Sequence, residues 1–70
     1  MDKCLLEKLA KRIKELRKLH KMTQDDLSYK SGIARSTLGN IETAQNDVTL
    51  TKVNSISKAF NMSLSEFLNF

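Results

Sequence analysis

Residues that interrupt helices are nearly absent from this sequence, which has no proline and only two glycines, Gly32 and Gly39, among its 70 residues. The regular alternation of apolar and polar residues that is typical of strands is also missing. A chain of this length can bury only one small hydrophobic core, so a second domain is not expected. The sequence therefore predicts an all-α fold in which residues 1–70 form a single domain.

The first twenty residues have the pattern of one long amphipathic helix of about five turns. Apolar positions recur at steps of three and four, which places them on one face, while lysines occupy another face. The apolar positions are Leu6, Leu9, Ala10, Ile13 and Leu16, followed by His20, and the lysines are Lys11, Lys14, Lys18 and Lys21.

A short second helix and a tight turn are predicted next. Thr23 and Asp26 have the spacing of a capping box, so a helix starts after Thr23 and uses Leu27 as its core residue. Gly32 can adopt the left-handed backbone angles that end a helix, and Ile33 then turns back into the core.

A third helix is predicted from about Arg35, with buried residues Leu38 and Ile41 three positions apart. The short turn before it forces the second and third helices to cross steeply, which is the geometry of a helix-turn-helix. Four residues of the third helix are left on its outer side: Arg35, Ser36, Gly39 and Asn40.

Two more helices complete the predicted fold. Thr49 or Asp47 can cap the fourth, and Ser63 with Glu66 forms a capping box for the fifth. The apolar stripe expected on the fourth helix consists of Leu50, Val53, Ile56 and Phe60.

Positive charge is concentrated in the first half of the chain. Residues 1–35 hold ten Lys and Arg against five Asp and Glu, and residues 36–70 hold two against three, which together give the net charge of +4. This asymmetry in a small domain favours an anionic partner, most often the phosphate backbone of a nucleic acid.

The residue types needed for catalysis or metal binding are not grouped. Cys4 is the only cysteine and His20 the only histidine, so neither a disulfide framework nor a zinc site is expected. We predict no enzyme activity, no cofactor and no small-molecule substrate. Charges are spread through residues 1–8, unlike a signal peptide, and no stretch approaches a membrane span, so a cytoplasmic location is expected.

Four parts of the sequence resemble the lambda-repressor-like, Cro-type (XRE-like) helix-turn-helix family: Arg17, residues 22–27, residues 31–38 and the pair Ile41-Glu42. Within that family, residues 23–31 most resemble restriction-modification controller proteins. The resemblance implies a compact five-helix DNA-binding domain, with the helix-turn-helix at about residues 23–43. It also implies a transcriptional regulator that binds double-stranded operator DNA as a homodimer, with its third helix in the major groove.

The same resemblance implies roles for individual residues. Gln24 matches a position that contacts the phosphate backbone and supports the recognition helix. Thr37 and Thr43 match further backbone-contacting positions. Arg17 and Glu42 match an ion pair between the first and third helices. The positions that match base-facing residues are Arg35, Ser36, Gly39 and Asn40, of which Arg35 suits guanine and Asn40 suits adenine.

The sequence departs from the family pattern at several positions. Ser28 stands where alanine is usual, and a serine is small enough for the helix contact there. Ala44 and Val48 replace a glycine and a proline, which leaves open the course of the loop after the third helix. Gly39 lies inside a helix, where glycine costs about 1 kcal/mol relative to alanine.

The last eleven residues contain more large apolar side chains than so small a domain can bury completely. Leu64 and Phe67 can close the core, and the remainder are expected to form a patch that pairs two copies of the chain. The residues predicted for this dimer interface are Phe60, Met62, Leu68 and Phe70.

Two alternatives to a DNA-binding regulator remain open at this stage. One is a helical protein-protein interaction module that does not bind DNA, because folds are reused for other functions. The other is a membrane-surface helix formed by the basic amphipathic residues 3–21.

Overall fold

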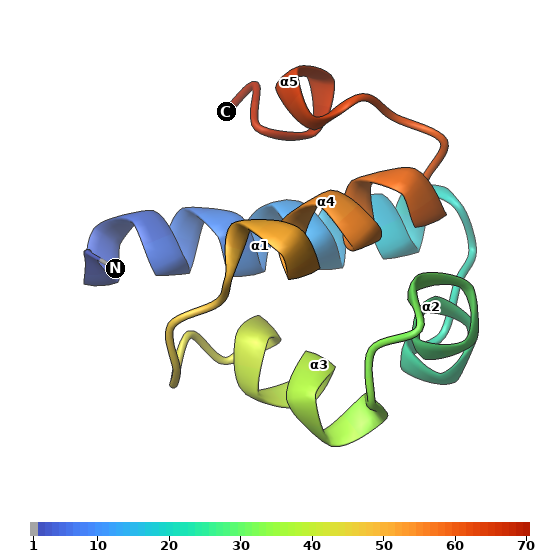
Figure 1. Cartoon of the computed structure of the whole chain (residues 1–70), viewed down its shortest axis with the longest axis horizontal. Helices are drawn as coiled ribbons and strands as arrows, with labels where there is room; N and C mark the ends of the chain where they lie inside the picture. The colour runs from blue at the N-terminus through green and yellow to red at the C-terminus, as the bar shows by residue number, and fades with distance from the viewer. Residues whose placement is uncertain (1) are drawn as a thin grey trace.

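The computed structural model describes residues 2–70, which form five α-helices and no strand. In chain order the helices are α1 (Lys3–Leu19), α2 (Gln24–Ser31), α3 (Arg35–Glu42), α4 (Leu50–Ala59) and α5 (Leu64–Phe67). Helices α1 and α4 lie across the middle of the molecule, with α2 and α3 on one side and α5 with the C-terminus on the other (Figure 1). The predicted all-α, five-helix fold is confirmed.

Short polar side chains start most of these helices. In α2 the Thr23 hydroxyl accepts a bond from the Asp26 N–H at 3.0 Å, and the Asp26 carboxylate accepts one from the Thr23 N–H at 2.9 Å. Ser63 and Glu66 repeat this reciprocal arrangement at the start of α5. The bonds donated by the backbone of Thr23 and of Ser63 hold the pKa of the Asp26 and Glu66 carboxyls below their ordinary values.

The helices pack around one apolar core to which all five contribute. The apolar residues predicted for α1 are buried in it, so the face that a membrane-surface helix would present to lipid is already covered. No helix within residues 2–70 has the length and apolar character needed to cross a membrane. The core cluster comprises Leu6, Leu9, Ile13, Leu16, Leu27, Ile33, Leu38, Ile41, Val48, Val53, Ile56, Phe60 and Phe67.

Two apolar residues in the second half of the chain lie differently from the expectation. Leu50, predicted in the buried stripe of α4, is 65% exposed, although Val48 before it and Val53 after it are buried. Phe60, predicted for the dimer patch, is only 1% exposed. Its ring centre lies 5.2 Å from that of His20 and 6.4 Å from that of Phe67. Phe60 therefore fills the core and presents no surface to a partner.

The short helix α5 is attached to α1 by Arg12. The Arg12 side chain donates from Nε to the Phe67 carbonyl and from Nη2 to the Glu66 carbonyl, both at 2.9 Å. The Glu66 carbonyl also accepts from the Asn69 N–H at 3.3 Å, so Arg12 adds to the bonds that close the end of α5. Phe67 is also fully buried. The position from which the last three residues continue is therefore fixed relative to the core.

Candidate nucleic-acid interface

Local hydrogen bonds fix the turn between α2 and α3. Gly32 adopts the left-handed conformation (φ 73°, ψ 13°), and its N–H donates to the Ser28 carbonyl at 2.9 Å. The Ser28 hydroxyl in turn donates to the Ile33 carbonyl at 2.6 Å, and the Ser31 hydroxyl accepts from the Ile33 N–H at 3.3 Å. Size alone suggested that serine at position 28 is tolerated. The structure shows that it adds a bond across the turn, which an alanine could not make.

A partly buried ion pair joins α1 to the end of α3. The Arg17 guanidinium donates from Nε and Nη2 to the two carboxylate oxygens of Glu42, each at 2.8 Å, and from Nη1 to the Met22 carbonyl at 3.2 Å. The Glu42 side chain is only 4% exposed. Two parallel bonds of this kind set orientation as well as contributing energy. The pair therefore fixes how α3 is placed on α1.

Gln24 extends this ion pair to the start of α2. Its side-chain amide donates to a Glu42 carboxylate oxygen at 3.2 Å. Gln24 is the first residue of α2 and is half-buried. The amide has a second N–H and a carbonyl oxygen that this bond does not use. One carboxylate therefore contacts groups from α1 and α2 while belonging to α3, so all three helices are linked at one point.

The outer side of α3 is polar. Leu38, Ile41 and Glu42 are buried on its inner side, so its one acidic residue is turned away from solvent and used in the ion pair. The Thr43 hydroxyl, just after the helix, donates to the Gly39 carbonyl at 3.0 Å. Of the residues predicted to contact DNA, Arg35, Ser36, Asn40 and Thr43 are exposed, and Thr37 and Gly39 are half-buried.

An exposed ion pair crosses the turn beside this surface. The Arg35 Nε lies 3.3 Å from Oδ1 of Asp25, and the two side chains are 66% and 71% exposed. The sequence motif that drew attention to Arg35 gave no role to Asp25, the second residue of α2. The pairing depends on the angle at which α2 and α3 meet, which is why it was missed.

The loop after α3 is ordered by its own contacts. Ala44 has φ 55°, a conformation that favours glycine, and the Gln45 N–H donates to the Asn40 carbonyl at 3.1 Å. Val48 is buried in the core. Ala44 thus holds a turn at the position where the family pattern has glycine, at the cost of some backbone strain.

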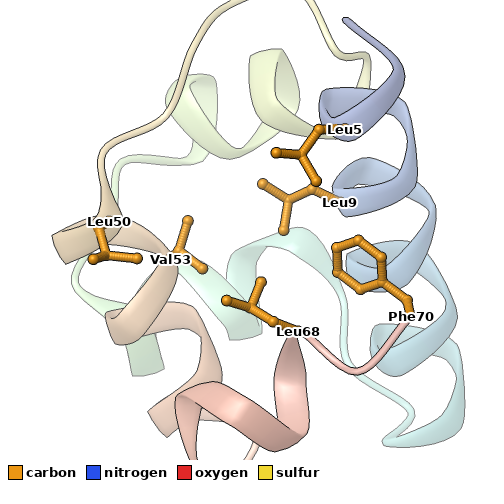
Figure 2. Close-up of a pocket in the computed structure, with 6 residues that line it drawn as sticks. All are labelled: Leu5, Leu9, Leu50, Val53, Leu68 and Phe70. Carbon is orange, nitrogen blue, oxygen red and sulfur yellow. The ribbon is translucent and has the colours of Figure 1, made fainter. Parts of the chain in front are cut away.

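The residues predicted for a dimer interface are not grouped together. Phe60 is in the core, as described above, and Met62 is half-buried against the core. Leu68 and Phe70 instead line an apolar groove of about 320 Å³ together with residues of α1 and α4. Figure 2 shows their side chains converging there with Leu5, Leu9, Leu50 and Val53.

Potential metal ligands are dispersed in the described part of the chain. No group of three or more His, Cys, Asp or Glu side chains in residues 2–70 is placed to hold a metal ion.

A tight turn between two short helices, with the second helix presenting a polar side, defines the helix-turn-helix class. The sequence matches the helix-turn-helix family HTH_3 over residues 13–67. The chain therefore belongs to this family, which confirms the resemblance found in the sequence.

The relatives of this chain are controller proteins and other transcriptional regulators. It is 31% identical to the control protein C.SmaI of Serratia marcescens over 62 residues, which are 89% of this chain and 74% of that protein. Its fold is similar to that of the restriction-modification controller protein C.AhdI of Aeromonas hydrophila, with a TM-score of 0.84, 31% identity, and coverage of 89% and 94% of the two chains.

A third relative has been seen on DNA. The restriction-modification controller protein C.Esp1396I, solved as a tetramer in complex with its natural 35 base-pair operator, matches with a TM-score of 0.82 and 34% identity. The match covers 91% of this chain and 88% of that one.

Proposed function

We propose that this protein is a sequence-specific DNA-binding transcriptional regulator that binds operator DNA as a homodimer through α3. The observation that carries the proposal is the polar outer side of α3, which the Arg17–Glu42 pair and Gln24 hold in a fixed position. A major groove about 12 Å wide admits a helix of this kind. The protein acts in the cytoplasm, as one domain of residues 1–70, without enzyme activity.

Residues of α3 divide between base and phosphate contacts. Arg35 donates to a guanine and Asn40 pairs with an adenine, each worth about 1–3 kcal/mol of discrimination. Ser36 lies beside them, and the missing side chain at Gly39 lets the helix backbone approach the bases. Thr37, Thr43 and Gln24 contact phosphates through their side-chain hydroxyl and amide groups.

The apolar groove lined by Leu68 and Phe70 binds a second copy of this chain. The groove exposes apolar area at Leu5, Leu50, Leu68 and Phe70, and such a patch on a small protein marks an association surface. The C-terminus, beside which Leu68 and Phe70 lie in the chain, is on the opposite side of α1 and α4 from α3 in Figure 1. Pairing there leaves both copies of α3 exposed, and the operator assembly of C.Esp1396I is also an oligomer.

The mechanism is occupancy of DNA. Two copies of α3 about 34 Å apart fit successive major grooves on one face of the duplex. A dimer bound in this way blocks or recruits RNA polymerase according to where its operator lies.

Selection of bound duplexes from a random oligonucleotide pool tests the proposal. The expected result is a two-fold symmetric consensus, with half-sites separated by about one helical turn, 10–10.5 base pairs from centre to centre. Enrichment of no sequence over the starting pool would contradict it.

A DNA-binding titration at several salt concentrations addresses the alternative of a protein-interaction module that does not bind DNA. A regulator binds duplexes of arbitrary sequence weakly and loses affinity steeply as salt rises, because counterions are released from the DNA. The absence of binding at low salt would favour the interaction module.

A further inference from the structure

The exposed Asp25–Arg35 pair lies at the edge of the surface proposed to meet DNA. Asp25 is the second residue of α2 and Arg35 the first residue of α3, and their contact joins Nε of the arginine to Oδ1 of the aspartate at 3.3 Å. Since both side chains are mostly exposed, the pair contributes little to folding stability. Its position indicates a role in binding instead.

We propose that Asp25 is a positioning residue for base recognition, which orients Arg35 towards a guanine and lowers its attraction to phosphates. This inference rests on the proposed function. A guanidinium has five N–H groups, and Oδ1 of Asp25 lies 3.3 Å from Nε, the guanidinium nitrogen nearest the main chain. The Nη1 and Nη2 groups at the tip stay available for the O6 and N7 atoms of guanine.

Two physical effects make this contact favour base recognition over phosphate binding. A guanidinium whose orientations are restricted by the neighbouring carboxylate loses less conformational freedom when it binds. The Asp25 carboxylate also offsets the positive charge of Arg35, which weakens its attraction to any phosphate irrespective of sequence. Both effects raise the ratio of specific to non-specific affinity.

The two roles that a carboxylate commonly has at the start of a helix do not account for the contact of Asp25 with Arg35. The carboxylate that closes the capping box belongs to Asp26, not to Asp25. Asp25 also lies in the first turn, where a negative charge stabilises a helix slightly. That effect alone would act on stability and would not depend on which base lies opposite Arg35.

The test compares the wild type with Asp25 variants and a control variant on the duplex selected by the wild type. Asp25→Asn removes the charge and keeps the shape, and Glu15→Gln is the matched control, since it removes one negative charge from an exposed position on α1. The relevant guanine is identified by replacing each guanine with 7-deazaguanine, which lacks the N7 acceptor. At that position the replacement weakens DNA binding by the wild type but not by Arg35→Ala. For each protein the measured quantity is the ratio of dissociation constants on the deaza and guanine duplexes.

Asp25→Asn is expected to lower this ratio by about threefold to fivefold, which is the upper range for an exposed ion pair, and to tighten binding to random duplex. Asp25→Glu, which restores the carboxylate, should recover part of the ratio. Glu15→Gln should leave the ratio unchanged, and thermal melting should show all three variants folded.

The outcomes separate this inference from the proposed function. If the wild type selects a duplex and Asp25→Asn keeps the wild-type ratio, or if no guanine depends on Arg35, the positioning role is overturned and the regulator remains. If the wild type selects no duplex at all, the proposed function fails first and the positioning role fails with it.

Discussion

At the scale of single residues, the most constrained group is the Glu42 carboxylate. It is almost fully buried, and it accepts hydrogen bonds from Arg17 and Gln24. A buried carboxylate with partners is tolerated, whereas one that loses its main partner retains the full cost of its removal from water. The family resemblance implied the Arg17–Glu42 pair and the support of α3 by Gln24, but only the structure shows that Gln24 gives this support through the Glu42 carboxylate.

Removal of Arg17 should therefore destabilise the protein strongly. Arg17→Ala is expected to reduce the free energy of unfolding by about 3 kcal/mol, because Glu42 would be left buried without a countercharge. Lys14→Ala, which removes a cation from an exposed position of the same helix, is the control and should cost less than about 0.5 kcal/mol. Urea unfolding measures both values, and equal losses would mean that the ion pair does not stabilise the fold.

The two capping boxes should make the folding stability of the protein depend on pH in the acidic range. The folded-state pKa of Asp26 and of Glu66 lies below the ordinary values of 3.8 and 4.5. A carboxyl whose pKa is lower in the folded than in the unfolded protein stabilises the fold at any pH above its unfolded-state pKa. This contribution is lost as the pH falls through its folded-state pKa. Thermal melting from pH 6 to pH 2 should therefore show a fall in Tm below about pH 4.5. The double variant Asp26→Asn, Glu66→Gln should show a smaller fall, and an equal fall would assign acid sensitivity to other carboxyls.

At the scale of the elements, local signals in the sequence predicted where helices begin but not how far the core extends. Thr23, Ser63 and Gly32 act through their immediate neighbours, and the structure has the predicted caps and turn at these positions. Leu50 and Phe60 belong to one periodic stripe, yet one is exposed and the other fully buried. Periodicity identifies the face of a helix, whereas burial along that face depends on which other elements cover it.

Replacement of Gly39 by alanine should increase folding stability and weaken DNA binding. A β-carbon there would meet no atom within 4 Å, and alanine favours a helix interior by about 1 kcal/mol over glycine. Gly39→Ala should therefore raise the free energy of unfolding by up to about 1 kcal/mol. It should also weaken binding to the selected duplex, because the added methyl group lies where the helix approaches the bases.

Gly32→Ala provides the contrast. Its φ of 73° disfavours any side chain although the space is empty, so this variant should lose about 1 kcal/mol of stability. Chemical denaturation and fluorescence anisotropy measure the two properties separately. Unchanged DNA binding by Gly39→Ala would show that the backbone of α3 does not come close to the bases.

At the scale of the whole molecule, the groove and α3 lie in different regions and serve different contacts. Arg12 fixes the end of α5 to α1, so Leu68 is held at the groove that Leu5 and Leu50 also line (Figure 2). The sequence indicated that the last residues carry surplus apolar area. It could not show that the first turns of α1 and α4 would join them, because that grouping is formed by segments distant in the chain.

A charge placed in the groove should prevent dimerisation. Leu50→Asp is expected to convert the dimer to a monomer, because an aspartate cannot be buried in an apolar contact without a partner. Leu19→Asp is the matched control, since Leu19 is 75% exposed and lies outside the groove. Sedimentation equilibrium measures the mass of each. A monomeric wild type, or dissociation by both variants, would exclude the groove as the dimer interface.

The central claim is that the exposed side of α3 recognises base sequence, and its most direct test is the preference of the protein for its selected duplex. We define this preference as the ratio of dissociation constants on an unrelated duplex and on the selected duplex at fixed salt. For the wild type it should reach at least about 10³. The double variant Arg35→Ala, Asn40→Ala should remain folded and bind the unrelated duplex within a few-fold of the wild type, while its preference falls by at least about tenfold. A double variant that keeps the wild-type preference would show that α3 does not recognise the sequence and would contradict the account.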